Sequence, residues 1–146
     1  MPNKPLRVVI DTNIWISFLM GKHLSKLQQV LVNEQVVILF SEELFDEMVE
    51  VLQRPKFKKY FSHEMIIELV ALLLRKIVWI QVTDSFNDCR DAKDNFLLAL
   101  SVSGKADYLV TGDMDLLILD PFHNTRIITY RSFEEVLLNL NRHFHN

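Results

Sequence analysis

Glycine is scarce in this sequence. The three glycines are Gly21, Gly104 and Gly112, and they lie far apart. Dinucleotide-binding and P-loop folds need two or more glycines within one short turn, because the backbone there must approach a phosphate closely. No segment of the chain has that spacing. Both classes of nucleotide-binding protein are therefore excluded.

Cysteine and long apolar runs are scarce as well. Cys89 is the single cysteine, which excludes an internal disulfide and a cysteine-rich zinc site and suits a reducing compartment. The longest nearly apolar run, residues 65–74, contains Glu68, and a membrane-spanning helix needs about 20 apolar residues. The first apolar run ends at Asp11, so we see no secretory leader. We expect a cytoplasmic protein with no membrane partner.

The sequence also lacks an excess of positive charge. Nineteen acidic residues against sixteen basic ones give a formal net charge of −3. This balance argues against a protein that simply coats nucleic acid. If four of the carboxylates bound cations, the remaining balance would become slightly positive. Composition alone does not decide between these cases.

The chain does contain the composition and periodicity of a globular α/β protein. Of its 146 residues 49% are hydrophobic and 24% are charged, which predicts one domain over residues 1–146. Short, continuous apolar runs predict strands at residues 6–10, 36–40, 77–82, 108–111 and 127–130. Segments with helical spacing alternate with them. Strands buried on both faces are typical of a three-layer α/β/α sandwich with a mainly parallel, five-stranded sheet.

Several residues are predicted to mark helix ends. Gly21 and Gly104 follow helical segments and are expected to end them. Asp91 precedes the helical segment that Gly104 ends and is a predicted N-cap. Ser132 and Glu135 have the spacing of a capping box at the start of the last helix.

Two aspartates directly follow predicted strands. Asp11 ends the run at 6–10, and Asp113 follows the run at 108–111 after one glycine. In parallel α/β sheets, ligands bind outside the carboxyl ends of the strands. Asp11 also stands where a helix N-cap is needed, so its position alone leaves a functional and a capping interpretation open.

Two further acids occur at positions where they can join these aspartates. Ser41 is a predicted N-cap of the helix at 42–53, and Glu47 lies beside the apolar stripe of that helix. The alternative for Glu47 is a boundary residue with a solvated carboxylate. Asp94 lies in the first turn of another helix, where the helix dipole favours a carboxylate with or without a further role. Lys93, beside it, is expected to point into solvent.

Together, the four acids indicate a metal site. Carboxylates brought close together raise one another's pKa and need a compensating cation. Mg²⁺ and Mn²⁺ prefer oxygen ligands, and an acidic site without histidine or cysteine suits cleavage of a phosphodiester by activated water. Candidate phosphate contacts, which are also plain surface charges in the alternative interpretation, are Arg7, Lys56, Lys58, Lys59, Arg90 and Lys93.

The acids lie within segments that resemble a known family. The segments, in chain order, are 9–14 (VIDTNI), 41–52 (from SEEL to VL), 91–94 (DAKD) and 110–115 (VTGDMD). Their order and intervals are similar to those of PIN domains, in particular the bacterial and archaeal branch that contains toxins of type II toxin–antitoxin systems. The resemblance extends over about residues 6–138. Tyr130 departs from it, because relatives often have proline there.

This resemblance implies both a site and an activity. It implies a Mg²⁺- or Mn²⁺-dependent ribonuclease that cleaves single-stranded RNA, with Asp11, Glu47, Asp94 and Asp113 as the catalytic acids and metal ligands. Asn13, Thr111 and Asp115, with Ser17 as a further candidate, match positions that support these acids through hydrogen bonds. Many members of the family form homodimers and are inhibited by a small antitoxin protein.

Three other functions are alternatives, and two of them require residues that can be checked in the sequence. A phosphatase of the haloacid dehalogenase type needs an aspartate where Asn13 stands, and a receiver domain needs a lysine after the fourth predicted strand. Neither pattern is present. A catalytically silent module that binds RNA or a protein partner remains open, and it would still bind after Asp11→Asn.

Overall fold

A parallel five-stranded sheet forms the centre of the protein. The computed structural model describes residues 4–20 and 24–144, and the sheet order within it is β3-β2-β1-β4-β5. All four strand pairs are parallel. The strands are β1 (Leu6–Ile10), β2 (Val36–Phe40), β3 (Ile77–Trp79), β4 (Tyr108–Val110) and β5 (Arg126–Ile128). The predicted fold class is confirmed, with a sheet that is parallel throughout.

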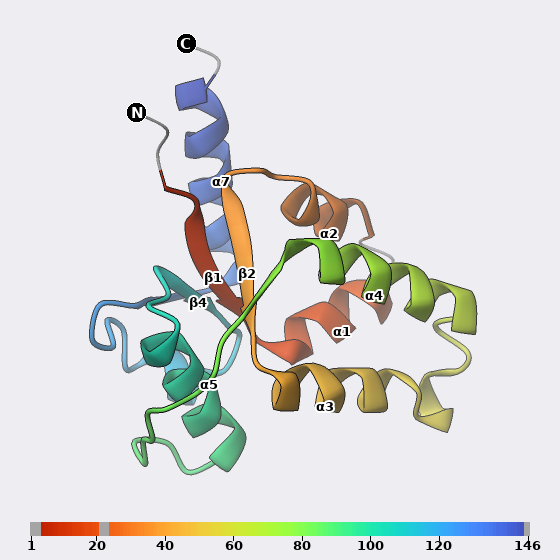
Figure 1. Cartoon of the computed structure of the whole chain (residues 1–146), viewed down its shortest axis with the longest axis horizontal. Coiled ribbons are helices and arrows are strands. Elements are labelled where there is room, and N and C mark those ends of the chain that lie inside the picture. Colours follow the sequence, from red (N-terminus) through yellow and green to blue (C-terminus); the bar gives the residue numbers. More distant parts are fainter. Residues whose placement is uncertain (1–3, 21–23, 145–146) are drawn as a thin grey trace.

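Helices flank the sheet (Figure 1). Helix α5 packs against β1, β2 and β4, and α7 lies behind β1 in this view. Helices α1 to α4 form a group in which α2 contacts α1 and α4, and α3 contacts α4. The bounds are α1 (Thr12–Met20), α2 (Leu24–Leu31), α3 (Glu42–Leu52), α4 (His63–Lys76), α5 (Ala92–Ser103), α6 (Met114–Leu117) and α7 (Tyr130–Phe144), with a short 3₁₀ helix at Pro55–Phe57.

The central strands are apolar because both of their faces are covered. Val8 and Val9 follow one another in β1 and are both fully buried, although successive side chains of a strand point to opposite faces. In β2, Ile38, Leu39 and Phe40 are buried in the same way. Such strands read as continuous apolar runs, which explains why β1 and β2 begin and end at the predicted residues.

The register brings the carboxyl ends of β1 and β4 together. Ile10 is paired with Val110, and the Asp11 backbone N–H donates to the Val110 carbonyl at 2.9 Å. Thr111 continues β4 in the same way, because its N–H donates to the Ile128 carbonyl of β5. The residues that follow these strands therefore lie side by side at one edge of the sheet.

The structure corrects several predicted boundaries, and β4 ends at Val110, one residue before its predicted end. Strand β3 ends at Trp79 instead of residue 82, because this strand has a neighbour on one side only and its last ladder bond is donated by the Ile80 N–H to Phe40. Strand β5 ends at Ile128, and α7 already begins at Tyr130. The predicted capping box is wrong, because Thr129 Oγ1 accepts the Ser132 N–H at 3.2 Å and Ser132 thus lies inside the first turn. The helix end predicted at Gly21 lies outside the described residues.

Gly104 ends α5 as predicted, but close packing is the reason for glycine there. Its φ is −87°, which any residue adopts. A Cβ atom at this position would lie 2.9 Å from Leu39 Cδ1 and 3.0 Å from the Leu100 carbonyl oxygen. Gly112 is the opposite case, since a Cβ there meets no atom within 4 Å and its φ is not positive.

Gly104→Ala is therefore expected to lower the free energy of unfolding by about 1–3 kcal/mol, as overpacking does. Gly112→Ala is the matched control and is expected to change it by less than about 0.5 kcal/mol or to stabilise slightly. Urea denaturation followed by circular dichroism measures both. Equal stability of the two variants would contradict the packing argument.

Candidate metal centre

Asp11 is buried at the carboxyl end of β1. Its side chain is 5% exposed. Oδ1 accepts the Asn13 backbone N–H at 3.0 Å, which is the contact expected of a cap at the start of α1. Oδ2 accepts the Thr111 hydroxyl at 2.9 Å. The capping contact and a place at the strand-end site thus occur together, and both carboxylate oxygens are held in fixed positions.

Thr111 connects the ends of β1 and β4. It is fully buried, and its hydroxyl donates to Asp11 and accepts the Asp113 backbone N–H at 3.1 Å. Asp113 is the N-cap of the short helix α6, and its Oδ1 accepts the Asp115 N–H at 2.9 Å. This chain of hydrogen bonds sets the position of Asp113 relative to Asp11.

Asp94 is the most unusual carboxylate of the group. Asp91 caps α5 by accepting the Lys93 N–H at 2.9 Å, as predicted, and Asp94 follows in the first turn. Asp94 is 5% exposed, and its Oδ2 has no hydrogen-bond partner among the described residues. The pKa of Asp94 is raised to about 7, mainly because the carboxyl group is buried and further because the carboxylate of Asp113 lies beside it. A buried, unpaired carboxylate is unfavourable without a cation.

Three carboxylates form a tight cluster. Asp94, Asp113 and Asp115 each offer an oxygen, and these oxygens lie within 4.8 Å of one another. From sequence, Asp115 was expected only to support the site, but its carboxylate is as close as the other two. Oxygen ligands of this kind suit Mg²⁺ or Mn²⁺. The cluster can therefore hold a metal ion, and the unpartnered Asp94 oxygen fits that role.

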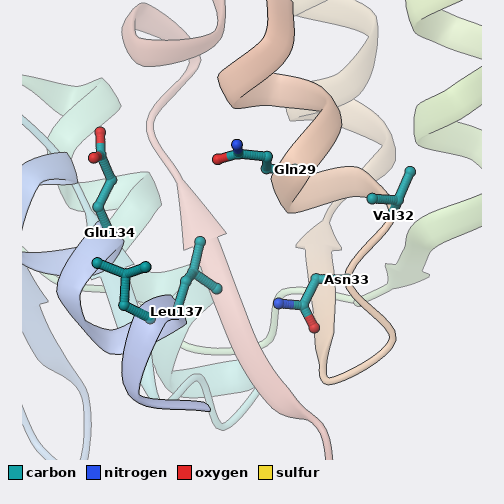
Figure 2. A pocket seen from close by; sticks show the side chains of 6 residues that line it. Gln29, Val32, Asn33, Glu134 and Leu137 are labelled. Carbon is teal, nitrogen blue, oxygen red and sulfur yellow. The ribbon is translucent and has the colours of Figure 1, made fainter. Parts of the chain in front are cut away.

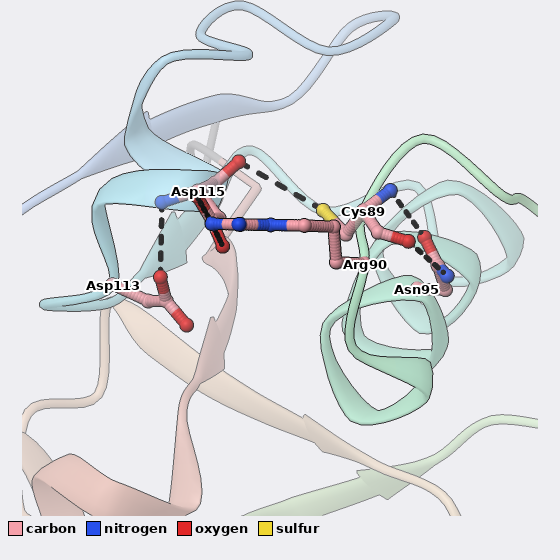
Figure 3. Close-up of polar contacts among 5 residues, drawn as sticks. All are labelled: Cys89, Arg90, Asn95, Asp113 and Asp115. Atoms are coloured by element: carbon pink, nitrogen blue, oxygen red, sulfur yellow. Dashed lines mark hydrogen bonds and ion pairs between the residues drawn. The ribbon is translucent and has the colours of Figure 1, made fainter.

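A short loop places a cation on the cluster (Figure 3). Arg90 Nη2 lies 3.1 Å and 3.2 Å from the two carboxylate oxygens of Asp115. Asn95 holds the loop, because Oδ1 accepts the Cys89 N–H at 2.8 Å and Nδ2 donates to the Cys89 carbonyl at 2.9 Å. Burial and the surrounding aspartates, Asp94 first among them, raise the pKa of the Cys89 thiol. Sequence reasoning missed Asn95, and no pattern in the chain marks it.

Glu47 is paired with Lys93 across the site. Lys93 Nζ lies 2.8 Å from Glu47 Oε1, and this contact is the main reason that the pKa of Lys93 is raised. Lys93 is exposed as expected, with 70% of its side chain accessible, and its ammonium group also pairs with Glu47 of α3. Ser41 caps α3 as predicted, with its hydroxyl accepting the Leu44 N–H at 3.2 Å. Glu47 is not part of the tight cluster.

All four predicted acids nevertheless line one cavity. Its volume is about 260 Å³, and Asp11, Glu47, Asp94 and Asp113 are among its lining residues together with Asn13. The four acids come from the ends of β1 and β4, from α3 and from α5, and Asn13 comes from α1. We call this space the acidic cavity. The structure brings the predicted residues together, while their roles as ligands stay predictions.

A cavity elsewhere on the surface offers no comparable cluster. It lies between α2 and α7 and has a volume of about 420 Å³; Figure 2 shows Gln29, Val32, Asn33, Glu134 and Leu137 around it. Among the described residues that line it, Glu134 alone has a carboxylate, and Lys26 Nζ lies 3.1 Å from that group. Arg7, a candidate phosphate contact, also lies away from the acids, because its Nε donates to the Gly104 carbonyl beyond the amino end of the sheet.

The fold and the site define a class of protein, namely α/β proteins whose acidic side chains gather at the carboxyl edge of a parallel sheet. The family model described as "PIN domain" matches residues 7–115, a range that contains every acid of the site. The chain therefore belongs to the PIN domain family.

Solved structures agree with this fold. The crystal structure of PAE2754 from Pyrobaculum aerophilum is 13% identical to this chain, with a TM-score of 0.56. The match covers 94% of this chain and 90% of that one. No curated protein matches the sequence. Within residues 4–20 and 24–144, no helix has the length and apolar character to cross a membrane.

Proposed function

We propose that this protein is a metal-dependent endoribonuclease that hydrolyses phosphodiester bonds of single-stranded RNA. The observation that carries the proposal is the buried carboxylate of Asp94, which has an unpartnered oxygen and lies within 4.8 Å of the Asp113 and Asp115 oxygens. Carboxylates this close raise one another's pKa, and a bound cation relieves that repulsion. Membership of the PIN family supports the choice of a nuclease.

The residues present fit a hard divalent cation. Asp94 and Asp113, with Asp11 and Asp115 beside them, would hold Mg²⁺ or Mn²⁺ directly or through water, and Glu47 would complete the acidic cavity. When bound, such an ion activates water and neutralises charge on the cleaved phosphate.

The chain's own residues orient the site and admit the substrate. Thr111 and the Asn13 N–H fix both oxygens of Asp11, so this carboxylate does not rotate when a ligand enters. Lys93 lines the acidic cavity. Arg54 lies close enough to Lys93 for its charge to lower the pKa of Lys93, which Glu47 raises. These two cations, followed in sequence by Lys56, Lys58 and Lys59, offer contacts to the phosphates of a strand leaving the site.

The family resemblance also supports a biological role. It favours the toxin component of a toxin–antitoxin pair, acting in the cytoplasm as a homodimer until a small antitoxin protein binds it. Co-expression with the product of a neighbouring gene, followed by purification of the complex, tests this part separately from the chemistry.

Cleavage of labelled single-stranded RNA tests the proposed function. With Mn²⁺ or Mg²⁺ we expect cleavage that leaves 5′-phosphate and 3′-hydroxyl ends, and with EDTA we expect none. Asp11→Asn is expected to lower kcat on the order of 100-fold or more, because it removes a charge that holds the ion. Gel electrophoresis of the products measures both effects.

Asp46→Asn is the matched control for that experiment. Asp46 is an exposed acid of α3 that does not line the acidic cavity, so this variant should cleave as fast as the wild type. Equal rates with Mn²⁺ and EDTA would refute the nuclease. RNA binding without turnover in the wild type, retained in Asp11→Asn, would instead identify a silent binding module.

A further inference from the structure

A second cavity opens directly beside the acidic cavity. Its volume is about 520 Å³, and the two cavities share Asp11, Asn13 and Asp113. The remaining wall of the second cavity comes from α1, from the turn after β4 and from the start of α7. The residues that line this cavity and not the acidic cavity include Ser17, Phe18, Gly112, Thr129 and Tyr130. We call it the aromatic cavity.

We propose that the aromatic cavity binds one nucleobase of the RNA, on one side of the phosphodiester that is cleaved. The inference rests on the proposed function and adds a base-binding subsite to it. Because Asp11 and Asp113 belong to both cavities, a phosphate held at the acids has its neighbouring nucleoside next to the aromatic wall. Among its described lining residues the acidic cavity has one aromatic side chain, Phe96, whereas the aromatic cavity has the adjoining pair Phe18 and Tyr130.

Two aromatic side chains adjoin one another in this wall, and Lys26 Nζ lies 6.0 Å from the centroid of the Tyr130 ring. The rings of Phe18 and Tyr130 meet edge to face, with centroids 4.4 Å apart, and both residues are half-buried. The ring centroid of Tyr130 also lies 6.1 Å from that of the fully buried Phe133. This contact holds Tyr130 in place at the start of α7. A base that packs on an aromatic side chain gains affinity whatever its identity, because every base has a π-face.

Polar groups at the rim suit the edges of a base. Asn13 and Ser17 are exposed residues of α1 that line the aromatic cavity. Within the described part of the chain, the Asn13 amide and the Ser17 hydroxyl make no hydrogen bond. The amide can donate and accept at once, as can the hydroxyl. Apart from the shared Asp11 and Asp113, the described residues that line the aromatic cavity carry no charge, and they combine aromatic surface with hydrogen-bond donors and acceptors.

Gly112 provides a direct way to block this subsite. A Cβ atom at position 112 meets nothing within 4 Å, and the backbone there does not have a positive φ. Gly112→Leu would place its side chain in the space beside the acids without displacing the chain. Tyr130→Leu removes the aromatic face but keeps an apolar side chain against Phe18 and Phe133, so the fold is retained.

The test uses short RNA oligonucleotides in which a single abasic ribose is moved from position to position. In the wild type with Mn²⁺, we expect kcat/KM to fall about tenfold when the abasic unit is on one side of the cut and to change little when it is on the other. Tyr130→Leu and Gly112→Leu should lose this asymmetry. Tyr60→Leu, which changes an exposed tyrosine that lines neither cavity, should keep the asymmetry.

A binding measurement separates this inference from the proposed function. Calorimetry with the Mn²⁺-loaded protein compares a nucleoside 5′-monophosphate with ribose 5-phosphate, which lacks the base. Tighter binding of the nucleotide, lost in Gly112→Leu, supports the subsite even if the protein cleaves no RNA. Equal binding of both probes, or an asymmetry of cleavage that survives in Tyr130→Leu and Gly112→Leu, would overturn the subsite while leaving the nuclease intact.

Discussion

Replacing Asp94 with asparagine is expected to abolish metal-supported RNA cleavage and, at the same time, to stabilise the metal-free protein. The loss of activity should be on the order of 1000-fold, since the variant removes a charged ligand from the centre of the cluster. The gain in the free energy of unfolding at pH 8 should be about 2 kcal/mol. A side chain that destabilises the empty protein is retained where function requires it.

The physical reason for the gain lies in the surroundings of Asp94. Its carboxylate is 5% exposed, and one of its oxygens has no hydrogen-bond partner in the described structure. Asparagine has the same shape, carries no charge and can donate a hydrogen bond to the neighbouring Asp113. The variant therefore removes the desolvation of a charge and a repulsion between carboxylates without opening a cavity.

Three measurements on one protein preparation decide the outcome. Urea denaturation gives stability without metal, the shift of the melting temperature with Mn²⁺ gives metal binding, and RNA cleavage gives activity. Asp46→Asn, the exposed acid on α3, should leave all three unchanged. A less stable Asp94→Asn protein, or one that still cleaves RNA at the wild-type rate, would contradict the assigned position of Asp94 in the centre.

The sequence predicted those parts of the fold that depend on burial alone. Strands β1 and β2 could be bounded to the residue because they are apolar on both faces, and the acids after β1 and β4 could be placed together because parallel strands end at the same edge of the sheet. The end of β3 and the start of α7 could not be predicted. The end of β3 depends on whether a further strand lies beside it, and the start of α7 depends on the hydroxyl of Thr129. The pattern of apolar residues in the sequence indicates neither.

The candidate site shows the same division. Asp11 and Asp113 were identifiable because they directly follow strands, and α3 and α5 bring Glu47 and Asp94 into the same cavity. The closeness of Asp115 to the cluster, its pairing with Arg90 and the clamp of Asn95 on Cys89 depend on a loop that has no regular pattern. The pairing of Lys93 with Glu47 likewise depends on how two helices pack.

The stability of the metal-free protein is expected to fall as the pH rises from 5.5 to 8. The pKa of Asp94 is about 7 in the folded protein, against an ordinary value of 3.8. Between these values the folded protein keeps a proton that the unfolded chain has released, so raising the pH favours unfolding until the folded carboxyl has also ionised. The loss should approach about 2 kcal/mol, or several degrees in melting temperature.

Saturating Mn²⁺ should remove this pH dependence. The ion competes with the proton for Asp94, so the rise in melting temperature that Mn²⁺ produces should be small at pH 5.5, grow up to about pH 7 and stay constant above it. The metal-free Asp94→Asn variant should lack the fall in stability that the metal-free wild type shows between pH 5.5 and 8. Differential scanning fluorimetry at constant ionic strength measures both series. Two results would show that Asp94 is already ionised in the folded protein: a metal-free wild type that is most stable at pH 8, or an Asp94→Asn profile that follows the wild type. An ionised Asp94 without a metal ion would need a neighbouring group that the described structure does not place beside it.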